Sequence, residues 1–235
     1  MRKVIRFLDG VENALVFLLF FLVFLAGLYS LIDTWMVYSH AVDSSILKYK
    51  PGYQGSPPDR EIQGDMAGWL TMDETGIDYP VMHGDTNEEY LNKDPYGDYS
   101  LSGSIFLDSR NSDDFSDEYS LIYGHHMEGG AMFGPLHKYL NRSYFEKHKN
   151  GTLTVKEKPY SLHAFAVMRT DATDPVIFTP TERPASEVLE YAEKNAVLKN
   201  DKEMEKAAGK KIVALSTCQY PDTIYRIIVL CYMDK

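Results

Sequence analysis

The chain has 235 residues, of which 44% are hydrophobic and 13% aromatic, a composition typical of a packed globular protein and unlike that of a disordered one. Its formal net charge of −10 at pH 7 repels phosphate backbones, which excludes nucleic acid as an expected partner. The same charge gives little attraction to an anionic membrane surface, so membrane attachment requires a hydrophobic segment.

An uncharged run of 19 residues near the N-terminus, Ala14 to Ile32, provides such a segment. At ~1.5 Å per residue, this run is long enough to cross a ~30 Å hydrocarbon core. Arg2, Lys3 and Arg6 precede it, and basic flanks tend to stay in the cytoplasm. The alternative is a cleaved signal peptide, but the run is long and no clean small-x-small cleavage pattern follows it. We therefore expect a single-pass membrane protein whose N-terminus is cytoplasmic and whose main domain is extracellular.

Four regions are expected along the chain. From Leu31 to Tyr49 the spacing of apolar residues suits a helix that continues out of the membrane with one apolar face. The Pro and Gly cluster from Pro51 to Asp59 then indicates a linker. The expected regions are a cytoplasmic tail (1–13), a transmembrane signal-anchor (14–32), an extracytoplasmic helix and linker (33–64) and a main domain (65–235).

The main domain contains eight short segments of strand-like composition, separated by turn residues. They are 68–72, 77–83, 103–108, 119–124, 151–157, 161–170, 210–218 and 225–233. Shorter helical segments are expected at 87–92, 130–140 and 185–200, the last with an apolar stripe of Val188, Leu189, Ala192 and Ala196. Eight strands and few helices predict a mostly-β domain, either a barrel or a sandwich, with additional helices.

The last two strand segments place a thiol and a cation at one edge of the sheet. Cys218 ends the segment KKIVALSTC, and Arg226 lies at the start of YRIIVLCYM. If these strands are neighbours, ~4.8 Å apart, the guanidinium can hold an oxyanion or a substrate carbonyl and its charge favours the thiolate. Because side chains alternate along a strand, Cys231 is expected on the face opposite Arg226, as a small buried residue. Cys218 is then a free thiol, not half of a disulfide.

A thiol nucleophile needs a proton partner, and the segment SLIYGHHM holds the best-placed histidine. His125 follows a strand and Gly124, so it lies at a strand end, whereas the adjacent His126 points in a different direction. Four other histidines are expected at the surface or in packing: His83, His137, His148 and His163. Each feature alone has an ordinary explanation, since a strand cysteine usually packs, a histidine pair usually lies in a solvated loop and a strand-start arginine is usually a solvated charge.

Metal binding is not expected. The acidic run DSRNSDDFSDE (108–118) lacks the Gly and terminal Glu spacing of an EF-hand loop, so it is interpreted as a solvated loop. The histidine pair has neither a thiolate cluster nor a third spaced ligand beside it. We expect neither a metal nor another cofactor.

Taken together, these motifs resemble the sortase family of membrane-anchored cysteine transpeptidases. LSTC, followed eight positions after its cysteine by Arg226, is similar to the family's Cys–Arg signature, and IYGHHM is similar to its histidine motif. Further segments resemble the class B branch: GWLTMDETGIDYPVM, DTNEEYLNKD, GSIFLDSRN and AMFGPLHKY. The likeness extends from Gly68 to Met233.

The resemblance implies a closed eight-stranded β-barrel with additional helices, and it implies roles for particular residues. Cys218 would be the nucleophile, His125 the acid/base partner and Arg226 the clamp for the oxyanion or the substrate. Four further residues would line the peptide groove: Asn87, Leu91, Tyr123 and Ser216. Gln219 replaces the acidic residue often found after the cysteine, so substrate contacts at that position are not carried over.

The implied reaction cleaves a C-terminal sorting motif of secreted proteins, forms a thioester on Cys218 and transfers the acyl group to an amine of a cell-wall precursor. Three alternatives stay open: a sortase that polymerises pilins through a pilin lysine, a cysteine peptidase that releases the free acid, and a non-enzymatic anchored module in which Cys218 only packs. Since reference pKa values are about 8.5 for a thiol and 6.5 for an imidazole, a thiolate–imidazolium pair predicts a bell-shaped pH–rate curve. A rate that keeps rising above about pH 9 would contradict the acid role of His125.

Overall fold

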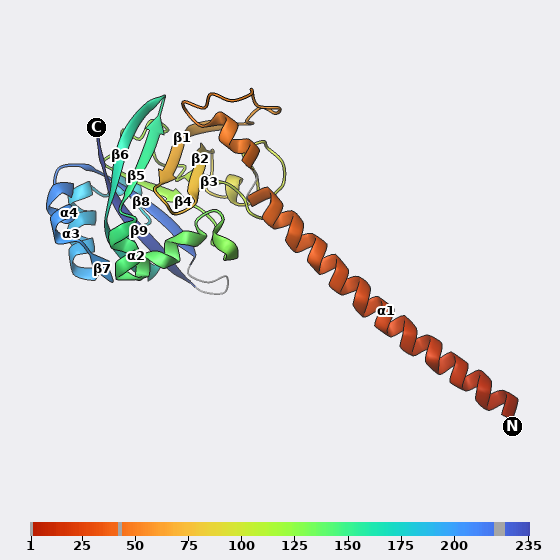
Figure 1. Cartoon of the computed structure of the whole chain (residues 1–235). Helices are drawn as coiled ribbons and strands as arrows, with labels where there is room; N and C mark the ends of the chain where they lie inside the picture. Colours follow the sequence, from red (N-terminus) through yellow and green to blue (C-terminus); the bar gives the residue numbers. More distant parts are fainter. Residues whose placement is uncertain (1, 42–43, 219–223) are drawn as a thin grey trace. The chain divides into compact units, whose positions relative to one another are not determined.

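The computed structural model describes residues 2–41, 44–218 and 224–235, without the side chains of Lys3, Val4, His40, Asp65, Glu128 and Cys218. The chain divides into two units, Met1–His40 and Ala41–Lys235. The first unit is a single continuous helix, and the second contains every strand (Figure 1).

Helix α1 (Arg2–Ala41) contains the whole of the predicted apolar run. Its side chains from residue 5 to residue 36 are all exposed, although most of those between residues 14 and 32 are apolar. A helix that is apolar on all sides and buries none of that surface suits a hydrocarbon environment. Within the described residues, this is the one helix whose length and composition allow it to cross a membrane.

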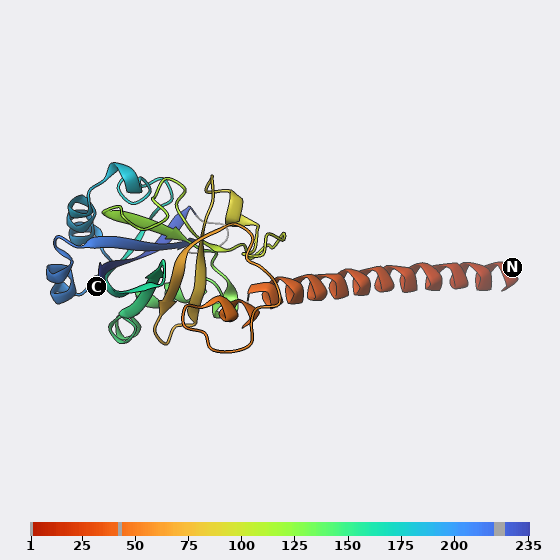
Figure 2. The same ribbon diagram turned by 90° about the horizontal axis from the view of Figure 1, so that it is seen from above.

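The second unit is a β-barrel (Figures 1 and 2). Its strands follow the order β5-β1-β2-β3-β4-β8-β9-β6, and pairing between β5 and β6 closes the ring. The eight strands are β1 (Asp65–Met72), β2 (Ile77–His83), β3 (Ile105–Leu107), β4 (Tyr119–Tyr123), β5 (Asn150–Val155), β6 (Lys158–Asp171), β8 (Lys211–Cys218) and β9 (Tyr225–Asp234). The predicted eight-stranded closed barrel is therefore confirmed. A two-residue strand, β7 (Leu198–Lys199), pairs with β6 and was not predicted, since two residues carry no recognisable period.

The strands near the C-terminus are buried on both faces, which explains their continuous apolar sequences. In β8, Val213 and Leu215 belong to one apolar cluster, whereas Ile212 and Ala214 belong to a second. The first cluster fills the barrel, and the second lies between the barrel and the helices outside it. Cys231 belongs to the interior cluster, is fully buried and forms no disulfide, as predicted, and burial raises its pKa to about 12.

Two helices cover the outer face of the barrel beside β6 (Figure 1). Helix α3 (Ala185–Asn195) buries Val188 and Ala192, as the predicted stripe requires. It ends before Ala196, however, because the chain then becomes extended and enters β7, so the prediction of a helix to residue 200 is wrong. Helix α4 (Asp201–Ala207) follows at once and begins at Asn200, whose side chain accepts a hydrogen bond from the backbone N–H of Glu203 at 3.1 Å.

The remaining helices are short. Helix α2 (Arg142–Lys147) was not predicted, and its first turn is capped by the side chain of Asn141. The predicted helical segments 87–92 and 130–140 contain the 3₁₀ helices η2 (Glu89–Leu91) and η4 (Gly134–Leu140). Two further 3₁₀ helices are η3 (Glu128–Gly130) and η5 (Pro180–Glu182).

The segment that precedes the barrel packs against strands β1 and β2. The 3₁₀ helix η1 (Ser44–Tyr49) places Ile46 against Trp69 and Tyr96. Next to this cluster, the carboxylate of Asp78 accepts hydrogen bonds from three side chains: Lys50 Nζ at 2.7 and 2.8 Å, Trp69 Nε1 at 2.7 Å and Thr71 Oγ1 at 2.8 Å. Residues 44–50 are thus part of the folded domain. Val42 of the predicted apolar face lies outside the described residues.

Candidate active site

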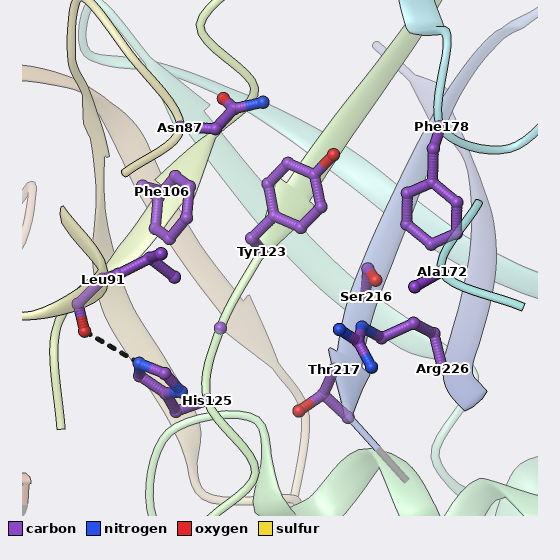
Figure 3. A pocket seen from close by; sticks show the side chains of 11 residues that line it. Asn87, Leu91, Phe106, Tyr123, His125, Ala172, Phe178, Ser216, Thr217 and Arg226 are labelled. Atoms are coloured by element: carbon purple, nitrogen blue, oxygen red, sulfur yellow. Dashed lines mark hydrogen bonds between the residues drawn. The ribbon is translucent and has the colours of Figure 1, made fainter. Parts of the chain in front are cut away.

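A cleft of about 290 Å³ opens at one rim of the barrel, where β4 and β8 end and β9 begins. Six of the predicted site residues line this cleft: Asn87, Leu91, Tyr123, His125, Ser216 and Arg226. Gly124 and four side chains that were not among the predicted site residues also line it: Phe106, Ala172, Phe178 and Thr217. Figure 3 shows Tyr123 with Leu91 and His125 on one side of it and Ser216, Thr217 and Arg226 on the other.

Strand pairing explains why these residues meet. Strands β4 and β8 are parallel, and their pairing ends at Tyr123 and Ser216. The N–H of Gly124 then donates to the carbonyl of Ser216 at 3.1 Å, so the residues that follow both strands emerge at the same rim. His125 is the next residue on one side, and Cys218 is the last residue of β8 on the other.

The backbone of Cys218 pairs with that of Arg226 in the antiparallel β8–β9 ladder, which implies a Cα separation of ~5 Å. The prediction that these two strands are neighbours and that the two residues meet at their ends is confirmed. The side chain of Cys218 and the whole of Gln219 lie outside the described part of the chain.

His125 is held by contacts from two other segments. Its Nε2 donates a hydrogen bond to the carbonyl oxygen of Leu91 at 2.8 Å, because a carbonyl can only accept. The N–H of Phe133 donates to the carbonyl of His125 at 3.0 Å, which fixes the backbone after the strand end. Nε2 thus carries a proton in this arrangement, and Nδ1 is the nitrogen left to gain or lose one.

The neighbouring histidine has different surroundings. The ring of His126 packs edge-to-face against that of His137, with 5.3 Å between the centroids, and His126 does not line the cleft. His148 is buried and stacks on Tyr144, with centroids 3.9 Å apart. Packing therefore accounts for these rings, and His125 is the histidine that reaches the cleft.

Two buried hydroxyl groups lie beside Arg226 in the cleft (Figure 3). Within residues 2–41, 44–218 and 224–235, Ser216 Oγ and Thr217 Oγ1 are buried without a hydrogen-bond partner. A buried polar group left unpaired costs about 1–3 kcal/mol. A bound ligand that hydrogen-bonds these hydroxyls would remove that cost.

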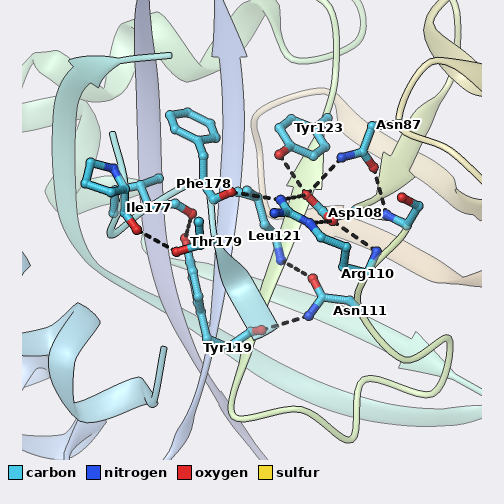
Figure 4. Close-up of polar contacts among 12 residues, drawn as sticks. Asn87, Asp108, Arg110, Asn111, Tyr119, Leu121, Tyr123, Ile177, Phe178 and Thr179 are labelled. Atoms are coloured by element: carbon cyan, nitrogen blue, oxygen red, sulfur yellow. Dashed lines mark hydrogen bonds and ion pairs between the residues drawn. The ribbon is translucent and has the colours of Figure 1, made fainter. Parts of the chain in front are cut away.

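The opposite part of the cleft rests on a buried carboxylate, Asp108 (Figure 4). Arg110 donates to it from Nε and Nη2, both at 2.8 Å, and from its backbone N–H at 3.0 Å. Tyr123 Oη donates at 2.9 Å and Asn87 Nδ2 at 3.1 Å. The interpretation of residues 108–118 as a solvated loop is therefore wrong for Asp108, and also for the buried Asn111, whose side chain bonds the backbone of Tyr119 and Leu121 in β4.

Electrostatics keep this carboxylate ionised. Burial raises the pKa of Asp108, but the hydrogen bonds from Arg110 and Tyr123 together lower it by more than burial raises it. The pKa therefore lies below its ordinary value. Burial, and then the charge of Asp108, raise the pKa of Tyr123 well above its ordinary value. Tyr123 therefore stays protonated and acts as a donor to Asp108. The ion pair of Asp108 and Arg110 had one signal in the sequence, which was an Asp at the end of an apolar strand with an Arg two residues later.

No three His, Cys, Asp or Glu side chains converge as metal ligands in the described part of the chain. The described cleft offers a histidine and a guanidinium, and the backbone of Cys218 ends β8 at the same rim.

Comparison with known proteins agrees with this geometry. A family model described as a sortase domain matches residues 70–234. The chain belongs to the sortase family. It is 33% identical over 179 residues to sortase B of Staphylococcus aureus, covering 74% of this chain and 72% of that protein.

Solved structures assign the sortase to a class. A class B sortase of Streptococcus pyogenes, described as involved in pilus biogenesis, matches with a TM-score of 0.63 at 41% identity, covering 71% of this chain and 91% of that one. A substrate complex of Staphylococcus aureus sortase B matches with a TM-score of 0.64 at 33% identity, covering 73% and 80%. This protein is thus a class B sortase, as the resemblance predicted, and its family are cysteine transpeptidases.

Proposed function

We propose that this sortase cleaves a sorting motif near the C-terminus of secreted proteins and transfers the acyl group to an amine of a cell-wall precursor. The observation that carries the proposal is the strand register, which brings the backbones of Cys218 and Arg226 together and ends β4 beside them, just before His125. The proposed proton carrier, His125, and oxyanion clamp, Arg226, then line one cleft, at the rim where the backbone of the proposed nucleophile lies.

In the first step, the thiolate of Cys218 attacks the carbonyl carbon of the scissile peptide bond. The guanidinium of Arg226, together with a backbone N–H, stabilises the negative oxygen of the tetrahedral intermediate. The C–N bond then breaks, and the imidazolium of His125 gives its proton to the leaving amine. The products are a thioester on Cys218, a neutral His125 and the released C-terminal peptide.

In the second step, the amine nucleophile attacks the thioester carbonyl, and His125 accepts the proton that the amine loses. The C–S bond breaks and an amide forms. Cys218 leaves as a thiolate and His125 is again an imidazolium, so the starting state is restored.

The remaining cleft residues form the peptide groove in this proposal. Asn87, Leu91, Tyr123 and Ser216 line the same cleft as His125 and Arg226, which supports their assignment as substrate contacts. Ser216 Oγ is a buried hydroxyl with no partner among the described residues, so it is available to a peptide backbone.

The N-terminal helix would anchor this enzyme in the membrane. We propose a cytoplasmic tail (1–13), a transmembrane signal-anchor (14–32), an extracytoplasmic segment (33–64), of which residues 44–50 pack onto the barrel, and an extracellular catalytic domain (65–235). Exposed apolar side chains along α1 support the membrane segment, and Arg2, Lys3 and Arg6 support the cytoplasmic N-terminus. Anchoring would confine the enzyme to the membrane face where secreted substrates and wall precursors meet.

Pilin polymerisation is a second candidate for the physiological reaction. It is favoured by the 41% identity to a class B sortase involved in pilus biogenesis. In that case the amine would be a lysine side chain of another pilin subunit.

Intact-mass spectrometry of the full-length protein in detergent tests both candidates. We would incubate it with pooled sorting-motif peptides and then add either a glycine-based amine or a lysine-containing peptide. A peptide adduct that is absent in Cys218→Ala and becomes an amide establishes a transpeptidase, and the preferred amine separates the two candidates. An adduct that yields only free acid despite the amines identifies a hydrolase. No adduct with any peptide, from protein shown to be folded, would count against the proposal.

A further inference from the structure

The cleft has two walls that come from distant parts of the sequence. One wall carries Asn87 and Tyr123, and the other is the segment 172–179, which contributes Ala172 and Phe178. Between them lie Asp108 and Arg110, neither of which lines the cleft. Their contacts reach both walls.

Asp108 holds the first wall. Its Oδ2 accepts from Tyr123 Oη at 2.9 Å and from Asn87 Nδ2 at 3.1 Å, and Asn87 Oδ1 accepts from the N–H of Ser109 at 2.7 Å. Both side chains are therefore oriented from behind, by groups that do not face the cleft. The carboxylate itself is completely buried, so no water competes for these bonds.

The second wall is internally rigid. The carboxylate of Asp174 accepts from the N–H groups of Val176 and Ile177 at 2.9 and 3.0 Å and from Thr170 Oγ1 at 2.7 Å. The N–H of Phe178 also donates to the carbonyl of Asp174 at 3.0 Å. Because Thr170 lies in β6, outside the segment, Asp174 both braces the segment and ties its start to the barrel, and further contacts outside the segment decide where residues 177 and 178 lie.

Two of those contacts are hydrogen bonds to consecutive carbonyls (Figure 4). Tyr119 Oη in β4 donates to the carbonyl of Ile177 at 2.8 Å, and Arg110 Nη2 donates to that of Phe178 at 2.8 Å. The ring of Phe178 then lies stacked over that of Tyr123, with centroids 6.4 Å apart and 10° between the planes. The second wall is thus held against the first.

Arg110 joins the two walls through one nitrogen. Nη2 carries two hydrogens, one directed to Asp108 Oδ2 and one to the Phe178 carbonyl, while Nε donates to Asp108 Oδ1. Only a planar guanidinium can make this set of bonds at once. A lysine ammonium keeps the charge but lacks the fixed fork.

From these contacts we propose that Asp108 and Arg110 are positioning residues that set the spacing between the two walls before the peptide binds. The inference rests on the proposed function of the cleft as the peptide groove. A groove fixed in advance loses less conformational freedom when the peptide binds, so the pair acts on substrate binding and motif selectivity. It does not act on the thiol chemistry at the strand ends.

The test compares wild type with Arg110→Lys and Asp108→Asn, as full-length protein with a peptide that acylates the wild type. We expect KM for the peptide to rise about tenfold in Arg110→Lys, with kcat within about twofold, because the lost bonds involve a charged donor. The rate of Cys218 alkylation by iodoacetamide should not change. The matched control is Arg60→Lys, since Arg60 also pairs with an aspartate, Asp98 at 2.7 Å, outside the cleft, and KM should stay within about twofold.

A second measurement does not depend on activity. Hydrogen–deuterium exchange of segment 172–179 should become faster in Arg110→Lys, while exchange in β8 and β9 stays at the wild-type rate. Asn87→Ala should also raise KM less in the Asp108→Asn background than in wild type, because Asn87 has already lost its support.

The outcomes separate the inference from the proposed function. Unchanged KM together with unchanged exchange in segment 172–179 would overturn the inference. So would a fall of kcat, alkylation rate and melting temperature in parallel, which would mean a general loss of structure. A wild type that forms no acyl-enzyme would refute the proposed function instead, and the exchange result would still decide whether Arg110 ties the walls.

Discussion

Strands β8 and β9 have opposite character at their two ends. Residues 212–215 and 227–231 are buried and apolar, and they contribute alternately to the barrel interior and to the core beneath the helices. At the rim, the same two strands carry Ser216, Thr217, Cys218 and Arg226, where buried hydroxyls have no partner in the described structure. The apolar part stabilises the barrel and fixes the register, whereas the unpartnered hydroxyls at the rim cost stability, a cost that the proposed substrate contacts would offset.

The largest effect should come from contrasting the two cysteines. Cys218→Ala removes the proposed nucleophile at the rim, so acyl transfer should fall by more than about 10⁴-fold. Cys231→Ala removes a buried thiol whose pKa burial raises to about 12, so turnover should stay within about twofold and stability should fall by about 1 kcal/mol. Peptide turnover and urea unfolding of both variants measure the contrast.

Thiol labelling of the folded wild type provides the control for that pair. Iodoacetamide should modify Cys218 and leave Cys231 unmodified until the protein unfolds, because Cys231 lies inside the barrel. Activity retained in Cys218→Ala but lost in Cys231→Ala would contradict the proposal, because the essential cysteine would then be the buried one and not the one at the rim.

The next effect concerns the cation that pairs with Cys218 across the ladder. Arg226→Lys keeps the positive charge but loses the second directed N–H, so kcat should fall about 10²–10³-fold, with a smaller change in KM. Steady-state kinetics with the peptide and amine measure it. A rise in KM alone would show that Arg226 only binds substrate and does not stabilise the oxyanion.

A sequence can predict the rim better than the network behind it. Strands and their ends are indicated by long apolar runs, one ending at Cys218 and one at Tyr123, just before His125. The hypothesis that the last two strands are neighbours was then enough to predict that Cys218 and Arg226 meet. Asp108 was misinterpreted because its partners, Asn87 and Tyr123, lie 21 and 15 residues away. Only the fold shows that such a carboxylate is buried and hydrogen-bonded to side chains distant in the sequence.

The same limit explains the errors in the helices. The stripe of Val188 and Ala192 predicted α3 correctly, because a helix period is local information. The end of α3 at Asn195 depends instead on β7 pairing with β6, which is a tertiary contact. The groove residues, Asn87, Leu91 and Ser216 among them, came from resemblance to the family, and their roles stay predictions.

Acid should reveal the contribution of Asp108 to stability. Its pKa in the folded state lies below the ordinary value, so the unfolded state binds the proton more tightly. The stabilisation is complete above about pH 4 and is lost as pH falls through the lower pKa of the folded state. Asp108→Asn should therefore lower the free energy of unfolding by about 2 kcal/mol at pH 7, and the difference from wild type should shrink below about pH 4.

Urea unfolding of wild type and Asp108→Asn, repeated about every half pH unit between pH 2 and pH 7, measures that difference. A gap between the two proteins that stays constant across this range would mean that the charge of Asp108 contributes nothing and that the amide disturbs packing alone.

The smallest effect should come from Asp78 in β2, a carboxylate that also accepts several hydrogen bonds but lies away from the cleft. It accepts from Lys50, Trp69 and Thr71, but its side chain is 31% exposed, so water screens the charge. Asp78→Asn should therefore lower stability by at most about 1 kcal/mol and leave KM and kcat for the peptide unchanged. Thermal unfolding and peptide kinetics test this together. A rise in KM like the one expected for Arg110→Lys would contradict this contrast, because burial beside the cleft would then not explain why Asp108 positions the groove while Asp78 only fastens residues 44–50 to the barrel.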